Sequence, residues 1–263
     1  MKKIKIFQAD AFSDKLFGGN PAAVCPLEEW LPENTMQQIA KENNLAETAF
    51  TVPFEDGFHL RWFTPETEVA LCGHATLVTA FIYFSELGYH SDTIKFFSKS
   101  GWLAVRKESH GKFTLDFPAD LPQEVNEFPC TIFEGLCISP TTVYKGKFDY
   151  LVELETEEQI AHLKPDFTKM YPLNARGLIV TAKGNEADFV SRCFFPDCGI
   201  PEDPVTGSAH CTMVAYWNKK TGKNKFTAIQ LSERKGYIDC ELKGDRVLMS
   251  GNAVLFLKGE IYI

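Results

Sequence analysis

The sequence has no long hydrophobic run. Its longest, residues 75–84, contains two threonines and is far shorter than the roughly 20 apolar residues that a membrane-spanning helix needs. The start of the chain also differs from a secretory signal peptide, because Lys5, Gln8 and Asp10 interrupt the apolar segment that should follow the basic residues. We therefore expect a cytoplasmic protein that does not bind or cross a membrane.

A basic stripe is also missing. The 263 residues include 35 acidic and 27 basic ones, which gives a formal net charge of -8. Nucleic acids and anionic membranes recruit clusters of lysine and arginine, so neither is an expected partner. The eight cysteines are scattered, unlike those of a short secreted disulfide protein. We interpret them as mostly reduced thiols that act as small apolar core residues.

Motifs for nucleotides and metals are absent. The chain contains no Walker loop, no G-x-G-x-x-G, no G-x-S-x-G and no H-E-x-x-H. Cys193 and Cys198 with His210 and Cys211 resemble a zinc set, but no second ligand pair has a matching spacing. Nucleotide-binding, flavin-dependent and metallohydrolase functions therefore have no support in the sequence, and we expect no metal site.

Short strands dominate the expected elements, and helices are few. The third of four expected helices opens with a capping box of Thr156 and Gln159, and the second and fourth end at Gly88 and Gly222. The helices are expected at residues 32–42, 75–87, 157–163 and 209–220. The strands are expected at residues 3–7, 22–25, 48–52, 59–63, 103–106, 113–117, 150–154, 177–181, 226–231, 237–241 and 253–257.

The helix at residues 75–87 is apolar on most of its sides, which predicts that it is buried on most of its sides. Because many short strands surround it in the sequence, we expect an α+β fold in which a curved, barrel-like sheet wraps around a central helix.

An internal repeat extends this expectation to the whole chain. Three pairs of motifs recur in the same order, roughly 130–135 residues apart. They are 61–65 with 192–196, 73–75 with 207–209, and Gly88 with Gly222. We expect two pseudo-symmetric halves with a cleft between them. The first half is residues 1–115, completed by 250–263, and the second is residues 116–249.

The repeat places two glycine-rich helix starts in equivalent positions, Cys72-Gly73-His74 and Thr206-Gly207-Ser208. Free backbone N–H groups and the positive end of the helix dipole favour anions at such starts. The pair therefore predicts a small carboxylate substrate. The alternative is that both glycines only permit a tight turn from strand to helix.

Three side chains could carry proton chemistry. Glu47 has mostly small or apolar neighbours, so desolvation could make it a general base, although a solvated strand glutamate is the plainer interpretation. His74 and His210 lie in the first turns of the two repeated helices, where the dipole disfavours the imidazolium. A neutral histidine there could donate or accept a hydrogen bond, or simply cap or pack against the helix.

Polar residues before the helices leave more than one interpretation. A helix start lowers a thiol pKa, which makes Cys72 the most reactive-looking cysteine, but its repeat equivalent, Thr206, cannot be a second thiolate. Asp203 could be a turn residue and Ser208 a helix N-cap.

A set of motifs along nearly the whole chain strongly resembles the PhzF family, the phenazine-biosynthesis-like isomerases. The motifs are Asp10-Ala11-Phe12, the stretch 17–24, Glu47-Thr48-Ala49-Phe50, the stretches 60–65 and 68–76, and the stretch 202–210. The resemblance implies a diaminopimelate-epimerase-like fold, a homodimer, and chemistry without a cofactor. In the phenazine enzyme a glutamate moves a proton across one face of trans-2,3-dihydro-3-hydroxyanthranilate.

The resemblance also implies roles for particular residues. The family's glutamate matches Glu47, its assisting residues match His74, Asp203 and Ser208, and Gly73 lies at the substrate's anionic group. Two other functions remain open on the residues alone. One is an amino-acid racemase or epimerase that uses Cys72 as a base, and the other is a non-catalytic binding or scaffold protein.

Overall fold

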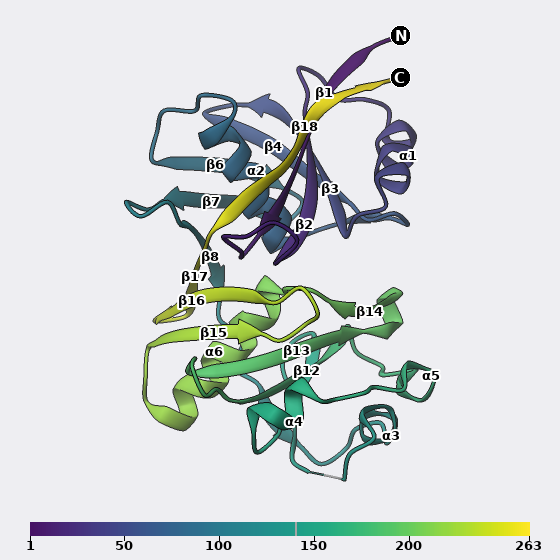
Figure 1. The fold of residues 1–263 in the computed structure, drawn as a ribbon, viewed down its shortest axis with the longest axis vertical. Helices are drawn as coiled ribbons and strands as arrows, with labels where there is room; N and C mark the ends of the chain where they lie inside the picture. The colour runs from purple at the N-terminus through teal and green to yellow at the C-terminus, as the bar shows by residue number, and fades with distance from the viewer. Residues whose placement is uncertain (140) are drawn as a thin grey trace. The chain divides into compact units, whose positions relative to one another are not determined.

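The computed structural model describes residues 1–139 and 141–263 and divides the chain into two compact units. Unit 1 comprises Met1–Asp116 with Ser250–Ile263, and unit 2 comprises Phe117–Met249. The sheet-rich arrangement with few helices is the expected α+β class (Figure 1). Strands β8 (Phe113–Pro118) and β17 (Arg246–Gly251) continue across the boundary between the units.

Unit 1 is a mixed sheet in which β2 pairs in parallel with β3, and β4 in parallel with β6. Its terminal strands lie side by side, because β1 and β18 are antiparallel partners (Figure 1). The elements are β1 (Lys3–Ala11), β2 (Asn20–Pro26), α1 (Glu33–Asn43), β3 (Glu47–Phe54), β4 (Gly57–Phe63), β5 (Glu68–Val69), α2 (Gly73–Ser85), β6 (Thr93–Ser98), β7 (Gly101–Lys107) and β18 (Ala253–Tyr262).

Unit 2 repeats this pairing order. Strand β11 pairs in parallel with β12, and β13 in parallel with β15, as β2 does with β3 and β4 with β6. The elements are β9 (Gln123–Val125), α3 (Thr131–Leu136), β10 (Val143–Lys145), β11 (Asp149–Glu153), α4 (Glu157–Ala161), α5 (Phe167–Met170), β12 (Gly177–Lys183), β13 (Phe189–Phe195), the 3₁₀ turn Pro196–Cys198, β14 (Ile200–Asp203), α6 (Gly207–Thr221), β15 (Lys225–Gln230) and β16 (Gly236–Lys243).

A hydrophobic helix occupies the centre of each unit. Ten of the thirteen residues of α2 are buried, and the helix packs against β1, β2, β3, β7 and β18. Ten of the fifteen residues of α6 are buried as well. A helix that is apolar on most sides is stable only when strands cover most of its surface. The expected centre of the fold is therefore confirmed, although both helices begin two residues earlier than expected, at Gly73 and Gly207.

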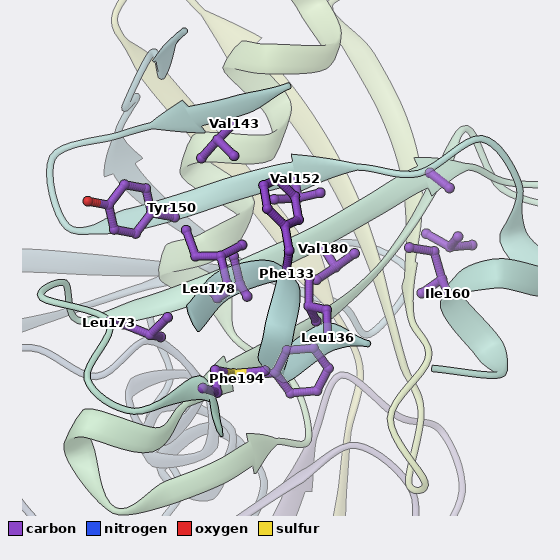
Figure 2. Close-up of a cluster of buried hydrophobic side chains, with 14 residues drawn as sticks. Phe133, Leu136, Val143, Tyr150, Val152, Ile160, Leu173, Leu178, Val180 and Phe194 are labelled. Carbon is purple, nitrogen blue, oxygen red and sulfur yellow. The ribbon is translucent and has the colours of Figure 1, made fainter. Parts of the chain in front are cut away.

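Alternation along the strands separates two cores. In unit 2, Leu178 and Val180 of β12 belong to a cluster with α3, α4 and α5 (Figure 2). The side chain of Thr181, the residue after Val180, faces α6, because its hydroxyl accepts a hydrogen bond from the Trp217 indole at 3.1 Å. Successive side chains of a strand point to opposite faces. Odd-numbered residues of β12 are therefore directed toward the central helix, and even-numbered residues toward the short helices.

Some local expectations are met residue by residue. The capping box at α4 is present. The Thr156 hydroxyl accepts from the Gln159 backbone N–H, and the Gln159 side-chain oxygen accepts from the Thr156 backbone N–H. All eight cysteines are free thiols. Five are buried, and Cys130, Cys137 and Cys198 are exposed, so the core interpretation is wrong for those three. No helix among the described residues is long and apolar enough to cross a membrane.

Candidate active site

Strand β3 and helix α2 bring Glu47 and His74 together in unit 1. The Thr51 hydroxyl contacts the Tyr83 hydroxyl of α2 at 2.8 Å, which shows that odd-numbered residues of β3 face this helix. Glu47 is the first residue of β3 and His74 the second of α2. The Glu47 Oε2 and His74 Nε2 atoms are 3.0 Å apart, and the two side chains are only 12% and 6% exposed. The solvated interpretation of Glu47 is therefore wrong.

These two facing atoms have unused hydrogen-bonding capacity. Within the described part of the chain, neither Glu47 Oε2 nor His74 Nε2 has a partner with hydrogen-bond geometry, although both atoms are buried. Buried polar atoms in native proteins are nearly always hydrogen-bonded, to protein or to water. A ligand that binds next to Glu47 Oε2 and His74 Nε2 can supply the missing hydrogen-bond partners.

The other side of the His74 ring is fixed by two buried neighbours. The Asn20 side-chain nitrogen lies 3.2 Å from His74 Nδ1, and the Cys72 sulfur lies 3.5 Å from the same atom. Asn20 is fully buried. It lies within the family-like stretch 17–24, but nothing in the residues predicted a role for it. Its position indicates that it orients the imidazole toward Glu47.

The electrostatics of His74 differ from the expectation of a neutral ring. Burial lowers the pKa of His74, but the negative charge of Glu47 at 3.0 Å outweighs burial and holds the pKa well above its ordinary value. The helix dipole was the only influence visible in the sequence. It opposes the imidazolium, but a carboxylate oxygen at 3.0 Å has the stronger effect.

Cys72 is not the reactive thiol that the sequence predicted. Burial, together with the nearby Glu47 charge, raises the pKa of the Cys72 thiol to about 11. The residue occupies the N-cap position of α2, where the dipole favours a thiolate, but it is only 7% exposed. Desolvation therefore prevails, and Cys72 is a neutral thiol near pH 7.

Glu47, Cys72 and His74 have ligand atoms that all lie within 4.8 Å of one another, which raises the question of a metal. The sulfur contacts Nδ1, whereas the carboxylate contacts Nε2, on the opposite edge of the ring. A single zinc ion bonds to one nitrogen of a histidine, at about 2.0–2.1 Å. The arrangement suits a chain of polar contacts better than a metal centre. Among the described residues, the cysteine–histidine set around Cys193 forms no such group.

In unit 2, a loop before α6 gathers the other predicted residues. Thr206 is the N-cap residue, and its hydroxyl donates to the Asp203 carboxylate at 2.6 Å instead of capping the helix. Ser208 is the second helical residue, so the interpretation of Ser208 as the N-cap is wrong. Its hydroxyl accepts a hydrogen bond from Arg176 at 3.0 Å.

Gln230 fixes this loop, although no motif in the sequence indicates such a role. Its side-chain oxygen accepts from the Thr206 backbone N–H at 2.8 Å, and its side-chain nitrogen donates to the Asp203 carbonyl oxygen at 2.7 Å. Gln230 is fully buried at the end of β15. An amide with a donor and an acceptor can satisfy two backbone groups of one turn at once. Gln230 thereby sets the conformation that presents Asp203 and Thr206.

Both helix starts retain backbone donors. Neither Cys72 nor Thr206 makes a side-chain capping hydrogen bond to its helix, and Gly73 and Gly207 are the first helical residues. The first N–H groups of a helix have no acceptor within the helix. This is compatible with the predicted role of both starts in binding an anionic group.

The second histidine has a structural environment. His210 Nδ1 contacts the Thr206 carbonyl oxygen at 2.8 Å, one turn back along α6. The residue is fully buried, and burial lowers the pKa of His210 to about 4. His210 is therefore neutral and packs in the core, which matches the packing alternative.

A separate pocket of about 410 Å³ lies in unit 1 and shares no residue with these groups. Arg61 and Lys99 contribute positive charge to its lining, but both bind the Glu68 carboxylate, at 2.8 and 2.5 Å. The positive charges of Arg61 and Lys99 in this pocket are thus already paired within the protein.

Comparison with known proteins identifies the family. Residues 9–259 match the model of the PhzC-PhzF family, described as phenazine biosynthesis-like protein. The chain belongs to this family. A Pseudomonas aeruginosa protein named as an uncharacterized isomerase is 46% identical over 99% of this chain and 100% of its own length.

Solved structures agree in fold. A PhzF-family phenazine biosynthesis protein of Enterococcus faecalis is 46% identical, with a TM-score of 0.95 over 100% of both chains. A hydroxyproline epimerase from Agrobacterium vitis, only 8% identical, has a TM-score of 0.65 over 99% of this chain and 91% of its own. The second likeness concerns the fold alone, and it extends the architecture to epimerases.

Proposed function

We propose that this PhzF-family protein is an isomerase that moves a proton between two carbons of a small unsaturated or amino carboxylic acid, without a cofactor. The observation that carries the proposal is the buried Glu47 carboxylate, which faces His74 at 3.0 Å and has no hydrogen-bond partner of its own at Oε2 among the described residues. Relatives at 45–46% identity are named isomerases, which supports the same reaction class.

In the proposed mechanism, the Glu47 carboxylate removes a proton from a carbon that conjugation makes acidic. The C–H bond breaks, and its electron pair delocalises into the conjugated system. Protonated Glu47 then returns the proton to another carbon on the same face, so the carboxylate is regenerated. The raised pKa of His74 places a positive charge 3.0 Å from the Glu47 carboxylate.

The remaining predicted residues bind and orient the substrate in this proposal. Backbone N–H groups at Gly73 and Gly207 stabilise anionic oxygen, aided by the dipoles of α2 and α6. Asp203 and Ser208 orient the substrate, together with Thr206, which is hydrogen-bonded to Asp203. One base is sufficient for a proton shift on a single face, so no second thiol is needed beside Cys72.

Deuterium exchange tests the role of Glu47. Wild type and Glu47→Gln would be incubated in heavy water with dihydro-hydroxyanthranilate and a panel of cyclic and amino carboxylic acids, and carbon-bound deuterium would be followed by NMR. We expect exchange with wild type and a loss of at least 100-fold in the variant, the order that positioned acid–base catalysis contributes. Normal turnover by Glu47→Gln would show that the assignment is wrong.

Replacing Cys72 separates an isomerase from a racemase. Because the thiol has a pKa of about 11 and is buried, we expect Cys72→Ser to keep the exchange activity within roughly threefold of wild type. A racemase that used Cys72 as its base would lose activity in this variant. Measuring stereochemical inversion and proton exchange on the same samples distinguishes the two.

We also propose, from the family resemblance, that the protein is a cytoplasmic homodimer. Sedimentation equilibrium of the purified chain tests the dimer directly, and a monomer at micromolar concentration would contradict it. The scaffold alternative predicts no exchange with any acid in the panel together with capture of a protein partner.

A further inference from the structure

In each unit a charged side chain at the start of a strand reaches the second residue of the central helix, and the two charges have opposite sign. Thr48 pairs with Phe63 in unit 1, and Leu178 pairs with Phe194 in unit 2, so Glu47 and Gly177 correspond as the first residues of β3 and β12. Glu47 reaches the second residue of its central helix, His74.

Gly177 has no side chain to reach α6. A Cβ at Gly177 would collide with the Phe195 ring, so no larger residue fits there without rearrangement. Instead, the preceding residue, Arg176, reaches the second residue of α6, and its Nη1 donates to the Ser208 hydroxyl at 3.0 Å. An anionic group in unit 1 thus has a cationic counterpart in unit 2.

A buried carboxylate holds the Arg176 guanidinium in place. The parallel register pairs Asp149 with Gly177, which sets Asp149 beside Arg176 at the start of two adjacent strands. Asp149 is 1% exposed and accepts from both Nε, at 2.9 Å, and Nη2 of Arg176. The rings of Phe148 and Phe195 lie 5.2 and 5.5 Å from the guanidinium carbon. A two-pronged ion pair flanked by aromatic rings leaves little rotational freedom.

This arrangement determines what Ser208 can bind. A serine hydroxyl has one hydrogen to donate and lone pairs to accept. Because Arg176 donates to the Ser208 oxygen, the hydroxyl hydrogen points away from Arg176 and toward the next acceptor. A charged donor also polarises the hydroxyl and strengthens it as a donor. Ser208 is therefore suited to an oxygen anion, and the positive guanidinium at 3.0 Å disfavours an ammonium group beside the same hydroxyl.

We infer that Arg176 is a substrate-positioning and specificity-determining residue, which commits Ser208 to donating a hydrogen bond to a carboxylate or enolate oxygen of the substrate. The inference rests on the proposed function for the identity of the substrate class. It adds that selectivity for an anionic oxygen in unit 2 depends on the Asp149–Arg176–Ser208 series. Arg176 acts through Ser208 and takes no part in proton transfer.

The test compares binding of two probes of nearly equal shape, the anionic 2-aminobenzoate and the neutral 2-aminobenzamide, by titration calorimetry on the full chain. We expect wild type to prefer the carboxylate by roughly tenfold or more, the range of a charge-assisted hydrogen bond. Arg176→Lys keeps the charge but loses the planar fork, and we expect it to lose most of the preference. Arg106→Gln, which removes an exposed arginine bound to Glu108, is the control and should leave the preference unchanged.

A double variant guards against misfolding. Arg176→Gln alone leaves Asp149 buried without its partner, whereas Arg176→Gln with Asp149→Asn replaces the ion pair by two amides. If this folded double variant, or Arg176→Lys, keeps the full preference for the carboxylate, the inference is wrong. It is also wrong if wild type binds both probes equally or binds neither.

The same titration on Glu47→Gln separates this inference from the proposed function. We expect Glu47→Gln to keep the preference for 2-aminobenzoate, since the Asp149–Arg176–Ser208 series is intact in that variant. An Arg176-dependent preference without deuterium exchange in wild type would support the inference and contradict the isomerase. Loss of the preference in Glu47→Gln would contradict the assignment of selectivity to Arg176.

Discussion

His210 is a fully buried imidazole in the first turn of α6, where it contacts the Thr206 carbonyl oxygen at 2.8 Å. Burial lowers its pKa to about 4, from an ordinary value of 6.5. Because the folded protein holds His210 neutral, the unfolded chain binds more protons below pH 6.5. The stability associated with His210 is therefore complete above about pH 6.5 and is lost as the pH falls toward 4, by an amount on the order of 3 kcal/mol.

A threonine at position 210 tests this prediction. The repeat supplies the choice, because the corresponding Thr76 of α2 donates its hydroxyl to the Cys72 carbonyl oxygen as His210 contacts that of Thr206. Urea unfolding at pH 7 and pH 4.5 should show a smaller loss of stability on acidification for His210→Thr than for wild type. The exposed His90→Thr is the matched control and should lose as much as wild type. Equal losses in all three proteins would contradict the prediction.

His74 has the opposite dependence on pH. Its pKa is raised by the charge of Glu47 despite burial, so its contribution to stability is complete below the unfolded pKa and decreases as the pH rises through the folded pKa. The two buried histidines therefore change the stability in opposite directions as the pH falls. The partner within 3 Å decides between the two cases.

At the scale of elements, each unit joins a long strand to a short one by an arginine–glutamate pair. Arg61 of β4 binds Glu68 of β5 through two hydrogen bonds of 2.8 Å. Arg192 of β13 binds Glu202 of β14 through two hydrogen bonds of 2.7 Å. Each glutamate lies five residues before the first glycine of a central helix. The pairs therefore fix the segments that lead to both helix starts.

We expect Arg192→Lys to weaken this connection. Lysine cannot make the two-pronged contact with Glu202, and the hydrogen bond from Arg192 to the Leu163 carbonyl oxygen at 2.8 Å is also lost. The free energy of unfolding should fall by about 2 kcal/mol, and exchange activity should fall with it as the Asp203–Thr206 loop loosens. Lys95→Gln, which breaks the exposed pair with Asp56, should lower the free energy of unfolding far less than Arg192→Lys does. Equal effects of the two variants in urea titrations would contradict this prediction.

For the whole molecule, the sequence sufficed for what depends on local pattern. The apolar run after Gly73 and the glycine stop at Gly222 predicted the central helices, although α2 ends at Ser85, before the stop expected at Gly88. Repeated motifs around Arg61 and Arg192 predicted two related halves. Glu47 and His74 were named from family-like motifs, and the structure brings them to 3.0 Å. That the two halves derive from one duplicated unit stays a prediction, supported by the matching order of strand pairing.

The residues that the sequence did not reveal act through contacts distant in the chain. Asn20 contacts His74 across 54 positions, Gln230 binds Thr206 across 24, and Arg176 binds Ser208 across 32. No periodicity or spacing indicates such pairs. The wrong expectations for the pKa values of Cys72 and His74 have the same origin. The helix dipole can be inferred from the sequence, whereas the burial of Cys72 cannot. Tertiary packing determined both.

The discontinuous composition of unit 1 gives a prediction for the whole chain. Strand β18 pairs with β1 along its whole length, from Lys3 with Tyr262 to Ala11 with Ala253 (Figure 1). A chain that ends at Asn252 leaves β1 without this partner and exposes an unpaired sheet edge. We expect hydrogen exchange to accelerate at least tenfold in β3 and β4, while β12 and β13 keep their protection, because unit 2 has its own buried core.

A chain that ends at Glu260 is the control and should resemble wild type. Equal acceleration in both units would show that they unfold as one cooperative body, and no acceleration would show that β18 does not stabilise unit 1.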